Sequence, residues 1–293
     1  ALLVNLVDPA TAQEIVDLAK TKDVPVVFFA CDVDEAVVES YDKCVTVNTD
    51  VSTLAKTMSG MIVTYIEENT ETIDRNGDGK ISYVLFGSET TPDFITELNS
   101  DLSQKNLPTV EFYDSANEGK LVPVAEAKAQ MKSILESYTD EGRNTVELIL
   151  SDSDVATMDI LVELQNKGFN RDKLTTHLIP VYTIGYEADY KEYVLSGKPE
   201  GAHDSENVKS YYEKMQYLTD LSTVEEEDLE DMIYNTFNVI DTGRILGTAI
   251  EDFDAISSAV ATVTANYIKG EDALKGLESD GKNILVPYTA YAN

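Results

Sequence analysis

Short apolar runs alternate along this chain with segments whose apolar residues follow a helical spacing. Residues 1–6 and 24–29 are nearly continuous apolar runs, the pattern of parallel strands that are buried on both faces. Between them, Asp8-Pro9 marks a helix start, and residues 10–22 carry apolar side chains at helical spacing. A strand, a helix and a second strand of this kind form a βαβ unit, which predicts a parallel sheet.

The same alternation continues through most of the chain. Further strands are predicted at residues 44–47, 81–86, 110–113, 146–150, 180–185, 245–250 and 284–288. Further helices are predicted at residues 51–68, 92–105, 122–138, 154–167, 231–239 and 253–269, the last of which stops at Gly270. Strands that alternate with helices in this way predict an α/β fold built on doubly wound parallel sheets.

Residues 188–230 break the alternation. They are polar, acidic and rich in tyrosine, and they include Tyr211-Tyr212 and the acidic run 225–228. We interpret this segment as an insertion with some helix, and its charge run as a solvated face.

The charge balance restricts the kinds of partner. The 293 residues contain 22 Lys and Arg against 54 Asp and Glu, a formal net charge of −32. A surface this acidic repels phosphate groups, which argues against nucleic acid and anionic membrane surfaces as partners. The sequence contains no apolar run of about 18 residues that would predict a membrane-spanning helix. This composition suits a soluble protein in a salty or calcium-containing medium.

The sequence does not predict an enzyme. No zinc-protease, nucleophile-elbow, phosphate-loop or dinucleotide motif occurs, and neither His177 nor His203 has an evident Ser or Cys partner. Cys31 and Cys44 lack the positive neighbours that activate a thiol. A disulfide between these two is possible, but at opposite ends of neighbouring parallel strands they would be too far apart to pair. We expect two free, largely buried thiols.

Residues 74–82 carry the most specific chemical pattern in the chain. Oxygen-bearing side chains stand at loop positions 1, 3, 5 and 9, and a glycine stands at position 6, which is the spacing of a calcium-binding loop. Lys80, at position 7, can offer its main-chain carbonyl. The four oxygen-bearing side chains are those of Asp74, Asn76, Asp78 and Ser82.

Two features separate this loop from an EF-hand. Leu85 stands at position 12, where an EF-hand has a bidentate Glu, and residues 81–86 have the pattern of a buried strand instead of a helix. The sequence therefore predicts a helix–loop–strand calcium site whose missing carboxylate comes from elsewhere in the fold. The ion would be structural because no catalytic group flanks it. The alternative is an Asp/Asn/Gly turn without a metal.

Several segments together resemble the calcium-containing galactose/glucose-binding proteins, a family of periplasmic solute-binding proteins. The resemblance is carried by residues 5–10, 24–29, 40–43, 74–82 and 286–288, and it covers almost the whole chain except about 188–230. It implies the type I periplasmic binding protein fold, an α/β fold in which two Rossmann-like lobes with parallel sheets are joined by a hinge. The implied N-terminal lobe is residues 1–50 plus 252–293, and the implied C-terminal lobe is residues 51–251.

The resemblance also implies a function. Proteins of this family hold a monosaccharide in the cleft between the lobes and deliver it to an ABC transporter permease and to a chemoreceptor. We therefore expect an extracytoplasmic protein, either periplasmic or a cell-surface lipoprotein, that binds a galactose- or glucose-like sugar and a structural Ca²⁺. In this family a Glu on a strand of the C-terminal lobe completes the calcium site, and Glu147 matches that position. The implied ligands are Asp74, Asn76, Asp78, Lys80, Ser82 and Glu147.

The family's sugar site transfers less completely. Of its polar sugar contacts only Asp93 is retained, and the stacking Trp is absent. Five other contacts of the family are replaced in this sequence: a Lys by Cys31, an Arg by Glu97, an Asn by Ser153, an Asp by Glu187 and a second Asn by Glu251. Tyrosines of the insertion are candidate replacements for the Trp, although packing within the insertion is the simpler interpretation. Four of the six implied contacts are acidic, so we expect another sugar, an amino sugar, a cationic solute, or loss of binding.

In that family two further strands and their helices precede the segment that matches residues 5–10. The N-terminal lobe is therefore expected to be incomplete in this chain, and its open apolar sheet edge to be covered by a longer natural protein or by a partner chain. The alternative function is the extracellular sensor domain of a receptor or histidine kinase on the same fold. A transcriptional repressor would need a DNA-binding motif before Ala1, and the net charge of −32 argues against it.

Overall fold

The chain is organised as two compact units. The computed structural model describes residues 1–88, 91, 93–113, 121–138, 145–170, 177–185, 236–241 and 243–292. One unit is Ala1–Leu54 with Glu251–Thr289, and the other is Ala55–Ile250 with Ala290–Asn293. The chain therefore passes between the units three times. Glu187 and the insertion predicted at residues 188–230 lie outside the described residues.

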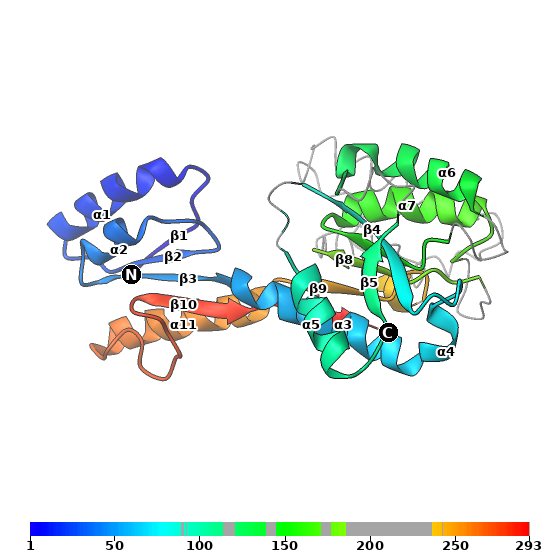
Figure 1. Ribbon diagram of the computed structural model, residues 1–293. Helices are drawn as coiled ribbons and strands as arrows, with labels where there is room; N and C mark the ends of the chain where they lie inside the picture. The colour runs from blue at the N-terminus through cyan, green and yellow to red at the C-terminus, as the bar shows by residue number, and fades with distance from the viewer. Residues whose placement is uncertain are drawn as a thin grey trace, which may run out of the picture. The chain divides into compact units, whose positions relative to one another are not determined.

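The first unit is built on a sheet of four parallel strands in the order β1-β2-β3-β10. Its strands are β1 (Leu2–Val4), β2 (Val26–Phe29), β3 (Cys44–Asp50) and β10 (Asn283–Pro287). Its helices are α1 (Ala12–Thr21), α2 (Glu35–Glu39) and α11 (Phe253–Lys269), with short 3-10 turns at Pro9–Thr11 and Val51–Thr53. In Figure 1, α1 and α2 lie on one side of this sheet and α11 lies on the other.

The side chains of alternate residues of β2 pack on opposite faces of the sheet. Val26 and Phe28 pack in one buried cluster with Val16 of α1. Val27 packs in a second buried cluster with Ile256 of α11. This burial on both faces is what a continuous apolar run predicts for a central parallel strand.

The first strand differs from its prediction. Residues 1–6 were expected to form a strand buried on both faces, but β1 spans only Leu2–Val4, and Leu2 and Leu3 are 42% and 47% exposed. The reason is its place at one end of the strand order, where it pairs with β2 on one side. Apolar composition alone does not distinguish a central strand from an edge strand, so the prediction of burial was wrong here.

The two cysteines are free thiols at opposite ends of neighbouring strands. Cys44, the first residue of β3, pairs in register with Val26, the first residue of β2, whereas Cys31 follows the end of β2. Five residues of chain from Val26 to Cys31 span roughly 16 Å, too far for a disulfide. Cys44 is fully buried, and burial raises the pKa of its thiol to about 11. Cys31 is partly exposed, so the expectation of burial holds for Cys44 alone.

We expect the two thiols to react with iodoacetamide at very different rates. The thiolate is the reactive form, and a thiol pKa two units above the ordinary value leaves about 100-fold less thiolate at pH 8. In the folded protein Cys31 should be alkylated first, and Cys44 should react only when the protein is unfolded. Mass spectrometry of the protein and of its Cys31→Ser and Cys44→Ser variants measures both rates. Equal rates in the folded protein would contradict this packing.

The second unit contains a seven-stranded sheet in the order β11-β9-β8-β7-β4-β5, with β6 also paired to β4. The pairs that join β9, β8, β7, β4, β5 and β6 are parallel. The strands are β4 (Lys80–Gly87), β5 (Thr109–Phe112), β6 (Val122–Pro123), β7 (Leu148–Ser151), β8 (Val181–Ile184), β9 (Gly247–Ile250) and β11 (Thr289–Ala292).

Helices cover both sides of this second sheet. They are α3 (Leu54–Glu68), α4 (Thr70–Ile73), α5 (Ile95–Gln104), α6 (Ala127–Ser137), α7 (Asp154–Asn166) and α10 (Thr236–Asp241), with a 3-10 turn at Val124–Glu126. In Figure 1, α6 and α7 lie on one side of the sheet and α3 and α5 on the other. Met131 of α6 and Leu161 of α7 are buried against Val84 and Ile149 of the central strands. None of the described helices is both long and apolar enough to cross a membrane.

Two predictions about the second unit were wrong in detail. A helix was expected over residues 122–138, but Val122–Pro123 is a short strand and α6 begins at Ala127. Proline disfavours helical geometry in the residue before it, which moves the helix start beyond Pro123. The last four residues of the described chain, β11, pair in the second sheet, whereas the sequence placed all of residues 252–293 in the first lobe.

Candidate functional site

The segment between α4 and β4 forms a tight loop that its own side chains close. One carboxylate oxygen of Asp74, Oδ1, accepts the N–H groups of Gly77 at 2.7 Å and Asp78 at 3.2 Å, and the other, Oδ2, accepts that of Gly79 at 2.8 Å. Asn76 Oδ1 accepts the N–H of Asp78 at 2.9 Å. Gly77 and Gly79 have φ of 71° and 86°, in the region that favours glycine. The oxygens at loop positions 1 and 3 therefore face the inside of the turn.

Glu147 joins the two ends of this loop from the segment just before β7. Its Oε1 accepts the N–H groups of Arg75 at 2.5 Å and Asn76 at 3.2 Å, and its Oε2 accepts that of Ser82 at 2.8 Å. The N–H of Glu147 in turn donates to the carbonyl of Ser82 at 2.8 Å. The side chain is buried, with 1% of the residue exposed. Burial raises the pKa of Glu147 and the negative charge of Asp74 adds to this, while the three main-chain hydrogen bonds oppose it.

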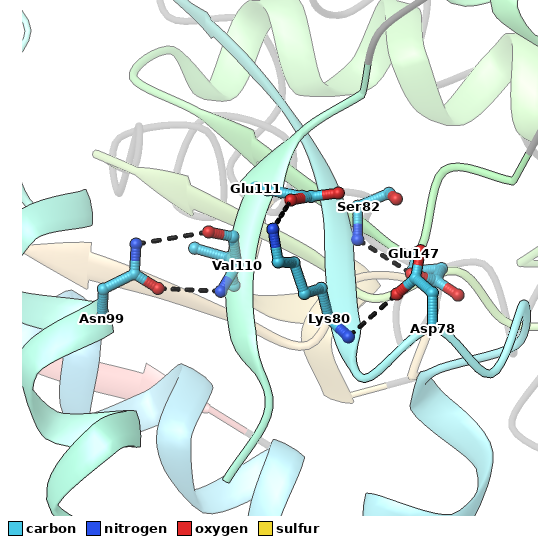
Figure 2. A network of polar contacts seen from close by, with 7 residues as sticks. All are labelled: Asp78, Lys80, Ser82, Asn99, Val110, Glu111 and Glu147. Atoms are coloured by element: carbon cyan, nitrogen blue, oxygen red, sulfur yellow. Dashed lines mark hydrogen bonds and ion pairs between the residues drawn. The ribbon is translucent and has the colours of Figure 1, made fainter.

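Figure 2 shows the exit of the loop into β4. The N–H of Lys80 donates to Asp78 Oδ1 at 2.9 Å, and the Lys80 ammonium pairs with the carboxylate of Glu111 on β5. Asn99 of α5 fixes β5 from its other side, because its amide accepts the N–H of Val110 at 2.8 Å and donates to the carbonyl of Val110 at 3.2 Å. The cationic side chain of Lys80 is thus held outside the turn.

The loop and Glu147 carry oxygen atoms of the kinds that calcium binds. In the part of the chain that the structure describes, no Lys, Arg or His forms an ion pair with the buried Glu147. The described His, Cys, Asp and Glu residues form no group of three that could hold a metal ion by themselves. Calcium would therefore need the amide, hydroxyl and carbonyl oxygens of Asn76, Ser82 and Lys80 beside the carboxylates. Calcium favours such a mixed set of oxygens, so the donor types fit it.

Asp93 and Glu97 lie together at the start of α5, and both are exposed. Asp93 Oδ2 accepts the hydroxyl of Thr96 at 2.7 Å, and Oδ1 accepts its N–H at 3.2 Å. These bonds from Thr96 lower the pKa of Asp93. The carboxylate of Asp93 is therefore ionised at neutral pH, and part of its hydrogen-bonding capacity is used within the helix start.

Ser153 is the N-cap of α7 and stands two residues after the end of β7, and its hydroxyl accepts the N–H of Ala156 at 3.3 Å. Its neighbour Asp152 was not predicted as a site residue. Asp152 Oδ2 accepts the N–H of Ser88 at 3.1 Å and the hydroxyl of Thr91. Because β4 and β7 are adjacent and parallel, their carboxyl ends meet at one edge of the sheet, where ligands of open α/β sheets bind.

Gly87, at the end of β4, leaves room for the hydrogen bond between the Thr91 hydroxyl and the Asp152 carboxylate. A Cβ atom at Gly87 would lie 2.5 Å from Thr91 Oγ1 and 3.1 Å from Asp152 Oδ2. The sequence signal for Asp152 was the polar run of residues 151–154 directly after an apolar strand. Asp152 is therefore a candidate carboxylate beyond those predicted from the sequence.

Cys31 and Glu251 belong to the first unit. The N–H of Cys31 donates to Asn48 Oδ1 at 3.1 Å, and its sulfur lies 3.9 Å from the carbonyl oxygen of Val4. Glu251 follows β9, and burial together with the charge of Glu251 raises the pKa of Tyr288. Glu187 is outside the described residues.

Comparison with known proteins identifies the family. The Periplasmic binding protein domain family matches residues 1–221, which is most of the chain. The chain belongs to this family, whose members are solute-binding proteins and not enzymes. The predicted resemblance and the predicted α/β fold with parallel sheets are thereby confirmed.

A curated protein and several solved structures are also similar to this chain. A D-galactose/methyl-galactoside binding periplasmic protein of Haemophilus influenzae is 30% identical over 155 residues, which are 53% of this chain and 46% of that protein. The chain thus matches about half the length of this curated relative.

Among solved structures, an ABC transporter, LacI family transcriptional regulator from Brachyspira murdochii is 11% identical with a TM-score of 0.51, covering 100% of this chain and 76% of that one. An ABC transporter solute binding protein from Clostridium phytofermentans, with bound β-D-glucose, is 13% identical with a TM-score of 0.48, covering 99% and 76%. Of these two structures, the one from Brachyspira murdochii has the higher TM-score, and at 11% identity it supports the fold alone.

Proposed function

We propose that this protein is an extracytoplasmic solute-binding protein of an ABC transporter. It binds a monosaccharide or a related small solute and delivers it to the membrane permease, with a chemoreceptor as a further partner. The family match over residues 1–221 carries this proposal. The identity to a galactoside-binding periplasmic protein supports a sugar as the ligand class.

The acidic groups at the strand ends of the second unit bear on the ligand. Asp93 and Glu97 are exposed at the start of α5, and Asp152 lies at the carboxyl edge of β4 and β7. Ionised carboxylates only accept hydrogen bonds, so they favour a ligand that offers donors and positive charge. We propose that an amino sugar or a cationic solute is preferred over a neutral sugar of the same shape.

Thermal unfolding with pairs of solutes tests this function. A ligand at about 100 times its dissociation constant stabilises the native state by about 2.7 kcal/mol. We expect at least one monosaccharide to raise the midpoint, and glucosamine or galactosamine to raise it more than glucose or galactose. Asp93→Asn and Asp152→Asn should reduce that difference, while Glu71→Gln, an exposed change on α4, should not. No shift with any sugar, amino sugar or cationic solute contradicts the proposal.

We further propose that the loop at residues 74–82 binds a structural calcium ion. The side chains of Asp74, Asn76, Asp78, Ser82 and Glu147 and the carbonyl of Lys80 would hold it. The in-turned oxygens of the loop and the buried Glu147 carboxylate support this proposal. A bound ion would supply positive charge to that carboxylate and hold the loop against the start of β7. Unfolding in calcium and in a chelator tests it.

A further inference from the structure

Arg75 occupies position 2 of the loop and is not one of the proposed calcium donors. Its N–H donates to Glu147 Oε1 at 2.5 Å, but its side chain turns to other partners. The guanidinium donates to Tyr138 Oη at 2.9 Å and to the carbonyl of Leu178. Tyr138 is the C-cap of α6, and Leu178 shortly precedes β8. One side chain therefore fastens the loop to two separate segments of the second unit.

The charge of Arg75 is unexpected beside a cation site. A guanidinium has the same sign of charge as calcium, so Coulomb repulsion alone predicts weaker metal binding with Arg75 than without it. Among the described residues the guanidinium forms no ion pair with Glu147, and it donates to two neutral oxygens. The buried carboxylate of Glu147 is thus left to the main-chain N–H groups of the loop.

The acceptor for Arg75 on α6 is itself held in place. The ring of Tyr138 packs edge-on against Phe169, with centroids 5.0 Å apart, and Phe169 packs in the same way against His177 at 6.0 Å. A planar guanidinium gains most from acceptors that are already fixed, because less conformational freedom is lost for each bond. The Tyr138 hydroxyl is such an acceptor.

We propose that Arg75 is a positioning residue for calcium binding, a proposal that rests on the calcium site proposed for this loop. Its tether holds the N–H groups of Arg75 and Asn76 on Glu147 Oε1, so that the first half of the loop has its binding geometry before the metal arrives. Preorganisation lowers the ordering cost of binding. Partners that orient metal ligands from outside typically change metal affinity by about 10–100-fold.

Calcium affinity and metal-free stability, measured side by side, test this role. Competition with a chromophoric chelator gives the calcium dissociation constant of the wild type and of Arg75→Met, Arg75→Lys and Tyr138→Phe, and urea unfolding in a chelator gives the metal-free stability. We expect the constant to rise about 10-fold in both Arg75 variants and by less in Tyr138→Phe, which keeps its ring. Adding Tyr138→Phe to Arg75→Met should cause no further loss.

Three results would overturn the proposal, and each points to a different explanation. An unchanged dissociation constant with lower metal-free stability would make Arg75 a purely structural residue. Tighter binding in Arg75→Met, with Arg75→Lys equal to the wild type, would mean that repulsion by its charge dominates. No calcium binding by the wild type would remove the calcium site itself and, with it, this inference.

Discussion

Calcium at about 1,000 times its dissociation constant is expected to raise the unfolding free energy of this protein by about 4 kcal/mol over its value in a chelator. A ligand that binds only the folded state stabilises it by mass action. For a unit of this size the gain corresponds to a rise of roughly 8–16 °C in the midpoint of the second unit. Circular dichroism or calorimetry in calcium and in a chelator measures the shift, and magnesium at the same concentration tests selectivity.

Glu147→Gln should abolish most of this calcium response, because it removes a buried carboxylate that is hydrogen-bonded to both ends of the loop. Glu111→Gln is the matched control. It makes the same chemical change on β5 and breaks the exposed pair with Lys80, but it touches no proposed donor side chain (Figure 2). The control should keep the full calcium shift.

Any of three results would contradict the calcium proposal. The first is a wild type whose midpoint is the same in 10 mM calcium and in a chelator. The second is a Glu147→Gln variant with an undiminished shift, which would place the calcium elsewhere in the protein. A fall of the response in Glu111→Gln equal to that in Glu147→Gln would show that the effect is one of net charge and not of ligation.

Asn170→Ala is expected to destabilise the second unit by about 3–5 kcal/mol. Asn170 is fully buried, and its amide nitrogen donates to the carbonyls of Ile179 at 2.7 Å and Arg244 at 2.9 Å. Its amide oxygen accepts the N–H of Ile179 at 2.8 Å. Alanine would remove all three of these hydrogen bonds from the buried amide and would also have to adopt the left-handed φ of 50°. Urea unfolding followed by circular dichroism measures the loss.

Two further variants separate these two costs. Asn106 also has a left-handed φ, 55°, just after a helix, but it is exposed, so Asn106→Ala should cost only about 1 kcal/mol. Asn170→Gly removes the strain and keeps the loss of hydrogen bonds, so it should still cost most of what Asn170→Ala costs. Hydrogen exchange should rise at β8 in both Asn170 variants. An Asn170→Gly protein as stable as the wild type would disprove the role of the amide.

Sequence signals predicted the helices and strands that are determined by residues close together in the sequence. The helix 253–269 was predicted with both of its ends, and Gly270 stops it in the left-handed conformation as expected. The structure adds that Asp252 caps its start. The apolar runs likewise predicted β2 and β4. The exposure of β1 and the pairing of β11 in the second sheet depend on strand order, which no local pattern contains.

The same division applies to the candidate site. The spacing within residues 74–82 predicted the loop, because its donors are neighbours in sequence. Glu147 was assigned only through the family resemblance, since nothing near it in the sequence points to a residue more than sixty positions away. The hydrogen bonds from Arg75 to Tyr138 and Leu178 were not predicted at all. An Arg in a polar loop gives no sequence signal for its partners, because they come from distant segments that meet only in the folded chain.

The first unit is assembled from two segments that precede and follow most of the second unit in the sequence, which sets an order for its folding during translation. A ribosome delivers β1, β2 and β3 first, but β10 pairs with β3, and α11 packs on β2 and β3. Both partners emerge only after almost all of the second unit. Most of the second unit, all but its last strand β11, is therefore made before the first unit has its full set of strands, although domains usually fold in the order of their synthesis. Until then, the edge of β3 that pairs with β10 and the face that α11 covers stay open.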